Sequence, residues 1–439
     1  MQQSIQFVRH VVLNKHFKRD TVISYCANAI VLGTSFLLMI MINHDAGVKS
    51  YGEIALVSSL SSLIATFISP KSIDAVTRFY IREKISQQRE NAKLIMVIAF
   101  GIDMIASGIL LGIFFGLSET IAIIFFEASE LSLIVLTYGY ISVSLLMRSS
   151  ISGYLQSHEL FGTINFFQIV DAGLKLVFVG ISLYSFENNT TQAIVDSYAL
   201  AAVTTTVLMA VIFFYYFKKE FSLVSLKYNA ALIKEYLLFN GKTFFATSIA
   251  SINNNIDTIM LGYFTNTTVV GIYQSLKNLL MPISFVSSPY AMLTTAQLTR
   301  FYSNQDKINF MGTLAKVTKV IVLFNVIIIA IMLLGLEYLL NVVGIDEVLR
   351  FEYVMLAVIV TIKQSIWWNP IVINFYNPLF IGVLAIVYGM FFQMTVWFLY
   401  FSVSSFQMIH IIIPNLIATI SVSFLAYRCL QRLVQRDMS

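Results

Sequence analysis

The sequence predicts an all-α membrane protein with about twelve transmembrane helices, and three observations lead to this prediction. Hydrophobic residues make up 58% of the 439 residues, charged residues make up only 12%, and the mean hydropathy is +0.79. A soluble domain carries about 25% charged residues, so the composition indicates a lipid environment. Apolar runs recur along the whole chain with no soluble stretch between them, and Lys and Arg gather in alternate connections.

Each apolar run is long enough to cross a bilayer core, which needs roughly 20 residues of helix. The runs are continuous, whereas the strands of a membrane barrel alternate with a period of two, so helices are expected. The predicted spans form two sets of six: 21–43, 51–69, 94–117, 131–147, 161–184 and 192–217, followed by 242–263, 270–293, 320–340, 351–368, 380–401 and 406–427.

The positive charges test this layout. With the amino terminus inside, the cytoplasmic segments carry 23 of the 28 Lys and Arg residues, when Lys242 at the inner edge of its span is counted with them. The outer connections carry only Lys49 and Arg350, and three more lysines lie within spans. Because positive charges are retained on the cytoplasmic side of a membrane, both termini are expected in the cytoplasm.

Two halves, 1–217 and 242–439, each hold six spans and are joined by a cytoplasmic linker, 218–241. Apolar residues alternate with Lys234 and Glu235 in this linker, which indicates an amphipathic helix on the inner leaflet; a solvated linker is the alternative. Both halves contain Ser-Pro followed by Thr-Arg-Phe-Tyr, at 77–80 and at 299–302. Six spans per half give the halves the same orientation, the arrangement of parallel repeats that transporters build around a central cavity.

No catalytic or metal-binding signature is found in the sequence. It contains no phosphate-cradling glycine loop, no nucleophile elbow and no Cys/His spacing typical of a metal site. The two cysteines exclude a disulfide framework. The net charge of +5 follows from the inner connections and does not indicate nucleic acid. We therefore expect no catalytic residues, no cofactor, no metal and no nucleic-acid partner.

Ionisable residues inside the predicted spans are the main functional candidates. A charge at the bilayer centre costs about 3 kcal/mol, so such groups usually face a cavity or a partner. Asp171 and Lys175 lie one helical turn apart on the same face. Asp257 and Lys277 lie on neighbouring spans at a similar depth, where they can pair directly. For both pairs, ligand or ion binding and a purely structural bridge remain open.

Other candidates stand alone in the sequence. Lys363 lies deep in its span with no acidic residue within one turn, and Asp103 lies near the middle of the third span. Further candidate cavity cations, for which a role in setting topology is the alternative, are Arg78, Arg148 and Arg300. Candidate polar and aromatic cavity walls are Asn253, Asn254, Trp367 and Trp368, the two tryptophans having an interfacial belt as the alternative.

Two motifs accompany this layout. The segment 255–263 reads Asn-Ile-Asp-Thr-Ile-Met-Leu-Gly-Tyr and is followed by Val-Gly-Ile-Tyr at 270–273, with a looser echo in Tyr51-Gly52 of the first half. Together with the two six-helix halves, these segments resemble the polysaccharide-transporter family, part of the superfamily that also holds multidrug and toxin extruders. In length and topology the chain is most similar to Wzx-type O-antigen flippases.

The resemblance implies transfer of an undecaprenyl-pyrophosphate-linked oligosaccharide, an O-antigen or similar repeat unit of lipopolysaccharide, to the outer leaflet of the bacterial inner membrane. It implies a cavity between two lobes with cationic and acidic residues inside the membrane. On this hypothesis the substrate moves by alternating access, and proton or sodium entry through Asp103, Asp171 or Asp257 can drive it. The anionic pyrophosphate requires cations, which Lys175 and Lys363 can provide. Implied partners are membrane lipids, a polysaccharide polymerase and a chain-length regulator.

Two other functions remain open. Cation-coupled multidrug extrusion uses the same fold and predicts altered drug efflux without a polysaccharide defect. A membrane glycan polymerase or ligase usually has a sizeable outer loop with catalytic arginines or acids. The outer connections here are short and hold only two basic residues, which disfavours the polymerase.

Overall fold

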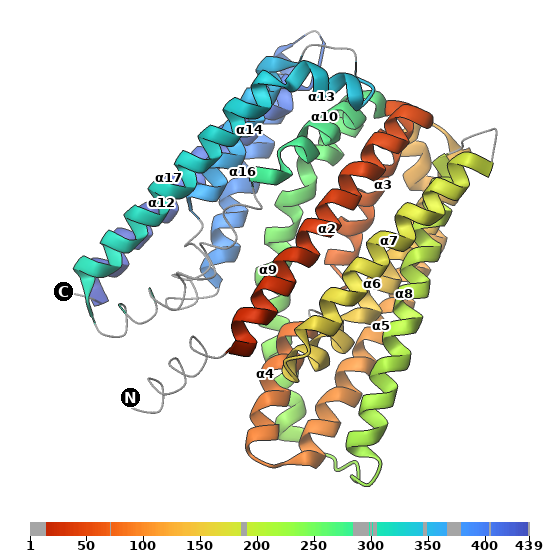
Figure 1. Ribbon diagram of the computed structural model, residues 1–439, viewed down its shortest axis with the longest axis vertical. Coiled ribbons are helices and arrows are strands. Elements are labelled where there is room, and N and C mark those ends of the chain that lie inside the picture. Colours follow the sequence, from red (N-terminus) through yellow and green to blue (C-terminus); the bar gives the residue numbers. More distant parts are fainter. Residues whose placement is uncertain are drawn as a thin grey trace. The chain divides into compact units, whose positions relative to one another are not determined.

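The computed structural model describes residues 15–70, 72–185, 191–283, 298, 301, 305–345, 349–366, 379–403 and 405–437. All regular secondary structure in these ranges is helical, and every predicted span contains a helix (Figure 1). The predicted all-α membrane fold is therefore confirmed. The helices are α2 (Lys15–Asp45), α3 (Gly47–Thr66), α4 (Ser72–Ile85), α5 (Arg89–Phe126), η1 (Ser129–Leu131), α6 (Ser132–Ser157), α7 (Phe161–Ser185), α8 (Thr191–Phe221), α9 (Ala230–Phe264), α10 (Thr267–Leu279), α12 (Lys307–Leu334), α13 (Leu336–Val342), α14 (Arg350–Ser365), α16 (Leu379–Ser402) and α17 (Ile409–Asp437).

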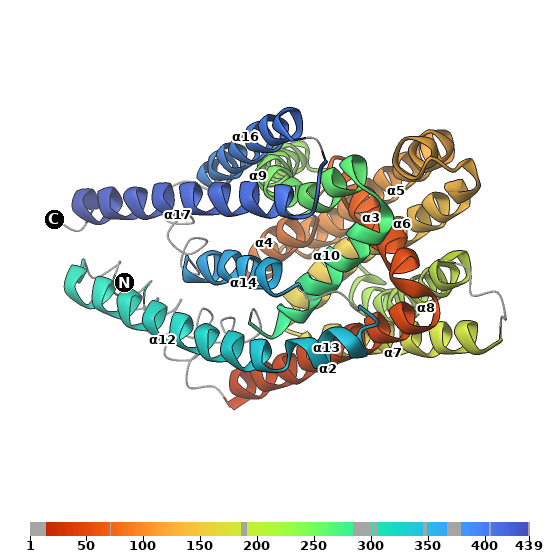
Figure 2. The same cartoon turned by 90° about the horizontal axis from the view of Figure 1, so that it is seen from above.

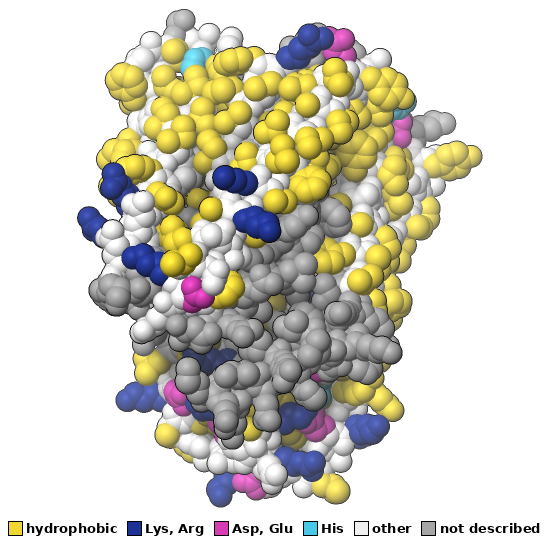
Figure 3. Space-filling model, turned by 60° about the vertical axis from the view of Figure 1, so that its left-hand side comes forward, with side chains coloured by type: hydrophobic (Ala, Val, Ile, Leu, Met, Phe, Trp, Pro, Cys, Tyr) yellow, Lys and Arg dark blue, Asp and Glu magenta, His cyan; other side chains and the backbone are white. Residues whose placement is uncertain are grey.

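Seven helices are long and apolar enough to cross a membrane by length and composition alone. Many of their large apolar side chains point outward; Ile105, Val211 and Ile331, for example, are more than 60% exposed. Figure 3 shows broad hydrophobic areas on one face. Apolar surface of this extent suits contact with lipid and would be unfavourable in water. The seven segments are Val22–Asp45, Arg89–Phe126, Ser129–Ser157, Phe161–Ser185, Thr191–Phe221, Lys307–Leu334 and Ile409–Arg432.

The chain divides into two compact units. Unit 1 contains Met1–Ala46 and Leu56–Ser248, and unit 2 contains Gly47–Ala55 and Ile249–Ser439. The division falls inside α9, and the first turns of α3 belong with unit 2. Residues that the sequence analysis placed in a separate linker helix form the first turns of the continuous α9.

Unit 1 has an apolar core that α4 helps to close. Pro70 precedes α4, and because proline lacks a backbone N–H and restricts its neighbour, α3 does not continue into α4. Phe79 and Tyr80 of α4 are buried, α4 packs on α5 and α6, and Tyr236 from the start of α9 joins the same core. The early part of α9 is thus anchored by packing as well as by its own helical hydrogen bonds.

In unit 2, α3 and α10 approach at two glycines (Figure 2). A Cβ atom on Gly52 would lie 1.7 Å from the backbone oxygen of Thr267, and one on Gly271 would lie 2.1 Å from that of Val48. Only glycine lets the two backbones come so close. The two segments that echo each other in sequence, around Gly52 and around Gly271, are therefore the ones that meet.

Candidate functional site: intramembrane charges in each unit

In unit 1, Asp171 of α7 lies between two cations. Lys175 Nζ is 2.6 Å from Asp171 Oδ2, and Arg148 of α6 donates from a terminal nitrogen to Asp171 Oδ1 at 2.9 Å. The Arg148 Nε donates to Thr206 Oγ1 of α8 at 2.7 Å, and the guanidinium also donates to the backbone oxygen of Ala202. Two cations share one carboxylate, so the cluster carries one surplus positive charge.

This geometry joins the predicted pair of Asp171 and Lys175 to Arg148. The sequence indicates Arg148 as a candidate cavity cation, with a role in setting topology as the alternative. The structure places the Arg148 guanidinium beside Asp171, which lies near the middle of α7. Because Arg148 and Asp171 lie on different helices, no spacing in the sequence predicts their contact.

In unit 2, Asp257 of α9 is the acceptor at the centre of a second cluster. Lys277 of α10 lies 3.1 Å from Asp257 Oδ2, as the sequence predicts, and the Tyr273 hydroxyl donates to the same oxygen at 2.6 Å. Asn415 of α17 donates to it at 3.4 Å. Asp257 is only 4% exposed, so its charge is compensated by partners rather than by water.

Lys363 of α14 belongs to the same region of unit 2. Its Nζ lies 5.2 Å from the centre of the Tyr388 ring, a cation–π distance, and the lysine interacts electrostatically with Asp257. Tyr388 in turn donates to Asn415 Oδ1 at 2.7 Å. In the described part of the chain Lys363 forms no ion pair within 4.0 Å, and its side chain is exposed. Unit 2 therefore also holds two cations for one carboxylate.

Asp103 of α5 is a buried carboxylate of a different kind. It is 1% exposed, and it accepts hydrogen bonds from Ser72 Oγ at 2.5 Å and from the backbone N–H of Ser150 at 2.9 Å. Within the ranges that the structure describes, no basic side chain pairs with it. Neutral donors alone stabilise an ionised carboxylate poorly in a dry environment, so Asp103 is suited to bind a proton or a small cation.

The remaining predicted residues lie elsewhere. Arg78 stacks on Phe239, with its guanidinium carbon 4.5 Å from the ring centre, and takes no part in either charge cluster. Asn253 is partly buried and Asn254 is exposed, both on α9. The last three predicted residues, Arg300, Trp367 and Trp368, lie outside the described residues.

A polar cluster that the sequence analysis missed closes one end of unit 1. Glu220, in the last turn of α8, accepts hydrogen bonds from the hydroxyls of Tyr80 and Tyr154, both at 2.7 Å. His158 Nε2 lies 3.1 Å from the same carboxylate. The four residues come from α4, α6 and α8 and share no spacing, so only the packing reveals them. They fix helix ends and are distinct from the charges within the spans.

Solved structures with a similar fold are membrane transporters. An inward-facing multidrug resistance MATE family transporter of the MOP superfamily has a TM-score of 0.73 and 12% identity, over 92% of this chain and 95% of that one. A MOP superfamily transporter from Pyrococcus furiosus has a TM-score of 0.66 and 13% identity, over 95% and 97%. The MATE multidrug transporter DinF-BH has a TM-score of 0.66 and 16% identity, over 95% and 96%. Among curated proteins, none matches the chain in sequence.

The fold and the apolar helices define a multi-pass membrane protein with the fold of the MATE transporters. The family model described as "Polysaccharide biosynthesis protein" matches residues 17–296, which is more than half of the chain. The chain therefore belongs to the polysaccharide biosynthesis protein family, and the resemblance drawn from its motifs is confirmed.

Proposed function

We propose that this protein is a flippase for an oligosaccharide linked to undecaprenyl pyrophosphate. It moves this substrate from the cytoplasmic to the periplasmic leaflet of a bacterial inner membrane by alternating access. The observation that carries the proposal is the charge of the two clusters. Each holds two cations and one carboxylate on apolar helices, so each retains one positive charge for an anionic ligand.

A surplus cation inside a membrane is energetically unfavourable unless a ligand or partner compensates its charge. A charge at the bilayer centre costs about 3 kcal/mol on insertion scales, and an inert structural bridge would need only one cation per carboxylate. Asp171 already has Arg148 and Asp257 already has Lys277. The additional lysine of each unit, Lys175 or Lys363, is therefore the cation available to an anionic pyrophosphate group.

The neighbouring polar groups suit a glycan. Tyr388 lies against Lys363, and Asn415 connects Tyr388 to Asp257, so hydroxyl and amide groups surround the cations of unit 2. Sugar hydroxyls both donate and accept hydrogen bonds, as amides and phenols do. For the energy-coupling step we propose Asp103, which binds a proton or sodium and has no ion-pair partner among the described residues.

The proposal is tested by locating the lipid-linked oligosaccharide in cells that lack this protein. Leaflet assays should show the substrate accumulating on the cytoplasmic side, with surface glycan restored by the wild-type gene. Normal distribution of the substrate, with altered efflux of dyes or antibiotics, would contradict the proposal and favour multidrug extrusion.

A further inference from the structure

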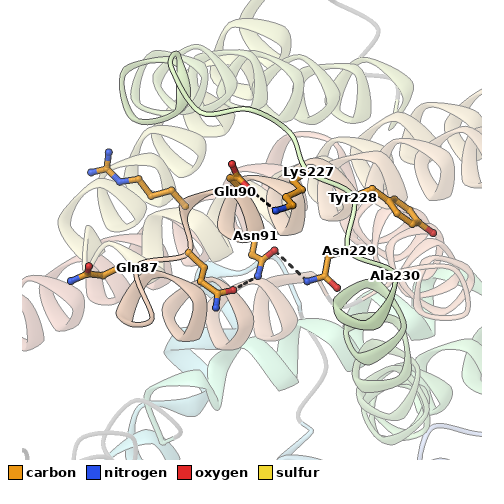
Figure 4. A pocket seen from close by; sticks show the side chains of 9 residues that line it. Gln87, Glu90, Asn91, Lys227, Tyr228, Asn229 and Ala230 are labelled. Carbon is orange, nitrogen blue, oxygen red and sulfur yellow. Dashed lines mark hydrogen bonds and ion pairs between the residues drawn. The ribbon is translucent and has the colours of Figure 1, made fainter.

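Unit 1 contains a second polar feature, separate from its charge cluster. A cavity of about 760 Å³ is lined by the turn before α5 together with the first residues of α5 (Gln87, Gln88, Arg89, Glu90 and Asn91) and by the segment that leads into α9 (Lys227, Tyr228, Asn229 and Ala230) (Figure 4). Both stretches lie in connections that the distribution of Lys and Arg assigns to the cytoplasm. The volume is in the range of small-ligand sites, roughly 300–1,000 Å³.

The walls of this cavity are held in place by contacts behind them. Lys93 Nζ donates to the backbone oxygen of Val224 at 2.6 Å, which ties the segment after α8 to α5. Ser225 Oγ donates to Glu90 Oε1 at 3.0 Å, and Asn229 Nδ2 donates to Asn91 Oδ1 at 3.4 Å. Because two segments 130 residues apart are joined in this way, the cavity is a built feature of the unit.

The chemistry of the lining favours a polyhydroxylated ligand. Four of the nine side chains are amides, each with a donor and an acceptor. Tyr228, which is 78% exposed, adds an aromatic face and a hydroxyl. Vicinal sugar hydroxyls also donate and accept, so amides and a ring face match them on both counts.

An anionic head group fits this lining less well. Glu90 lies 4.0 Å from Lys227 and offsets its charge, which leaves Arg89 as the surplus cation of the lining. The Glu90 carboxylate and the amide oxygens are acceptors, and they oppose a phosphate, which is itself an acceptor. The site therefore differs in kind from the cationic clusters within the spans.

We propose that this cavity binds the glycan part of the transported substrate on the cytoplasmic side, before transfer. This inference rests on the proposed function, since it assigns the glycan of the same lipid-linked molecule to a first docking site. The role of Tyr228 is to stack on a sugar ring, and that of Gln87 and Gln88 is to hydrogen-bond its hydroxyls.

The test uses the full chain in lipid nanodiscs and oligosaccharides released by mild acid from the lipid fraction of the producing cells. Saturation-transfer NMR should detect binding, and Tyr228→Ala should weaken it at least about fivefold. Tyr184→Ala is the matched control, because Tyr184 is also exposed, at 93%, and lies outside the cavity lining. Tyr184→Ala should leave the signal unchanged.

Three results would overturn this inference. One is the absence of oligosaccharide binding, and another is binding that Tyr228→Ala does not change. The third is binding of inorganic pyrophosphate or of phosphatidylglycerol in the nanodisc that depends on Lys227, without oligosaccharide binding. The function and the cavity are tested separately, because normal leaflet distribution in cells lacking the protein contradicts the function whether or not the cavity binds sugar.

Discussion

Gly52 of α3 and Gly271 of α10 face each other across a helix crossing, and neither position has room for a Cβ atom. The obstructing atoms are backbone oxygens of Thr267 and Val48, which a side-chain rearrangement cannot move. The contact is reciprocal, since a Cβ on Gly271 would also lie 3.1 Å from the backbone nitrogen of Gly52. Two equivalent segments of the repeat thus meet backbone to backbone.

Replacing either glycine should therefore destabilise unit 2. Overpacking costs about 1–3 kcal/mol, and at these distances Gly271→Ala should lower the thermal unfolding temperature of the detergent-solubilised protein. Gly108→Ala is the control, because nothing lies within 4 Å of a Cβ there and the change gains up to about 1 kcal/mol in helix propensity. Equal stability of Gly271→Ala and wild type would refute the close approach.

The bridge between Asp257 and Lys277 should show strong energetic coupling. Lys277→Met leaves a carboxylate that is 4% exposed with one cation fewer, and losing one partner of a buried pair costs about 3–5 kcal/mol. The double change to Asn and Met should cost less than the sum of the single changes in a denaturation cycle. The exposed pair of Arg350 and Glu337 serves as the reference, with coupling of at most about 1 kcal/mol. Additive single changes at Asp257 and Lys277 would show that the bridge is not a structural unit.

Arg148 should not tolerate lysine, whereas Lys175 should tolerate arginine. The Arg148 guanidinium reaches Thr206, Asp171 and the Ala202 carbonyl at once, and a lysine ammonium cannot keep that planar geometry. Arg148→Lys should cost about 1–3 kcal/mol through unsatisfied acceptors, measured as a fall in unfolding temperature. Lys175→Arg, which changes a residue with a single carboxylate partner, is the comparison. An identical effect of the two substitutions would contradict the assigned geometry.

Acid should weaken the contact between α4 and the start of α9. Arg82 donates to both oxygens of Glu235, at 2.7 and 3.0 Å, and these hydrogen bonds lower the pKa of Glu235 from its ordinary 4.5. A lowered folded-state pKa means that the stabilisation is complete above about 4.5 and is lost as the pH falls through the folded-state value. The pair is solvent-exposed and screened, so the effect is at most about 1 kcal/mol.

The measurement compares wild type with Arg82→Gln in unfolding temperature at neutral pH and near pH 3. The difference between the two proteins should be largest at neutral pH and should shrink in acid. A difference that stays constant across this range would show that Glu235 and Arg82 do not interact as described.

The sequence was sufficient to predict the helices and two charge pairs, Asp171 with Lys175 and Asp257 with Lys277. Each span could be predicted because a helix that crosses a bilayer needs a long apolar run. The pairing of Asp257 with Lys277 could be predicted because the connection between α9 and α10 is short and keeps the two helices adjacent. The contact of Arg148 with Asp171 was not predicted, because the two residues lie on different helices and no sequence spacing relates them.

Other features needed the packing itself. The hydroxyl donors around Glu220 come from α4 and α6, whereas Glu220 itself ends α8. Tyr388, which contacts Lys363, and Asn415, which accepts from Tyr388, come from α16 and α17. Such contacts depend on which helices pack against one another, and the periodicity of apolar residues does not predict which helices are neighbours. The start of α9 was predicted as a surface helix, but the buried Tyr236 side chain shows that one of its faces packs into unit 1.

The most direct test of the account removes only the surplus charges, by changing both Lys175 and Lys363 to Gln. Asp171 keeps Arg148 and Asp257 keeps Lys277, so the protein should remain folded and abundant. Surface glycan per amount of protein should then fall at least about tenfold, whereas the double change to Arg, which keeps both charges, should retain most of it. Undiminished surface glycan in cells with abundant Lys175→Gln/Lys363→Gln protein would contradict the claim that these cations bind the substrate.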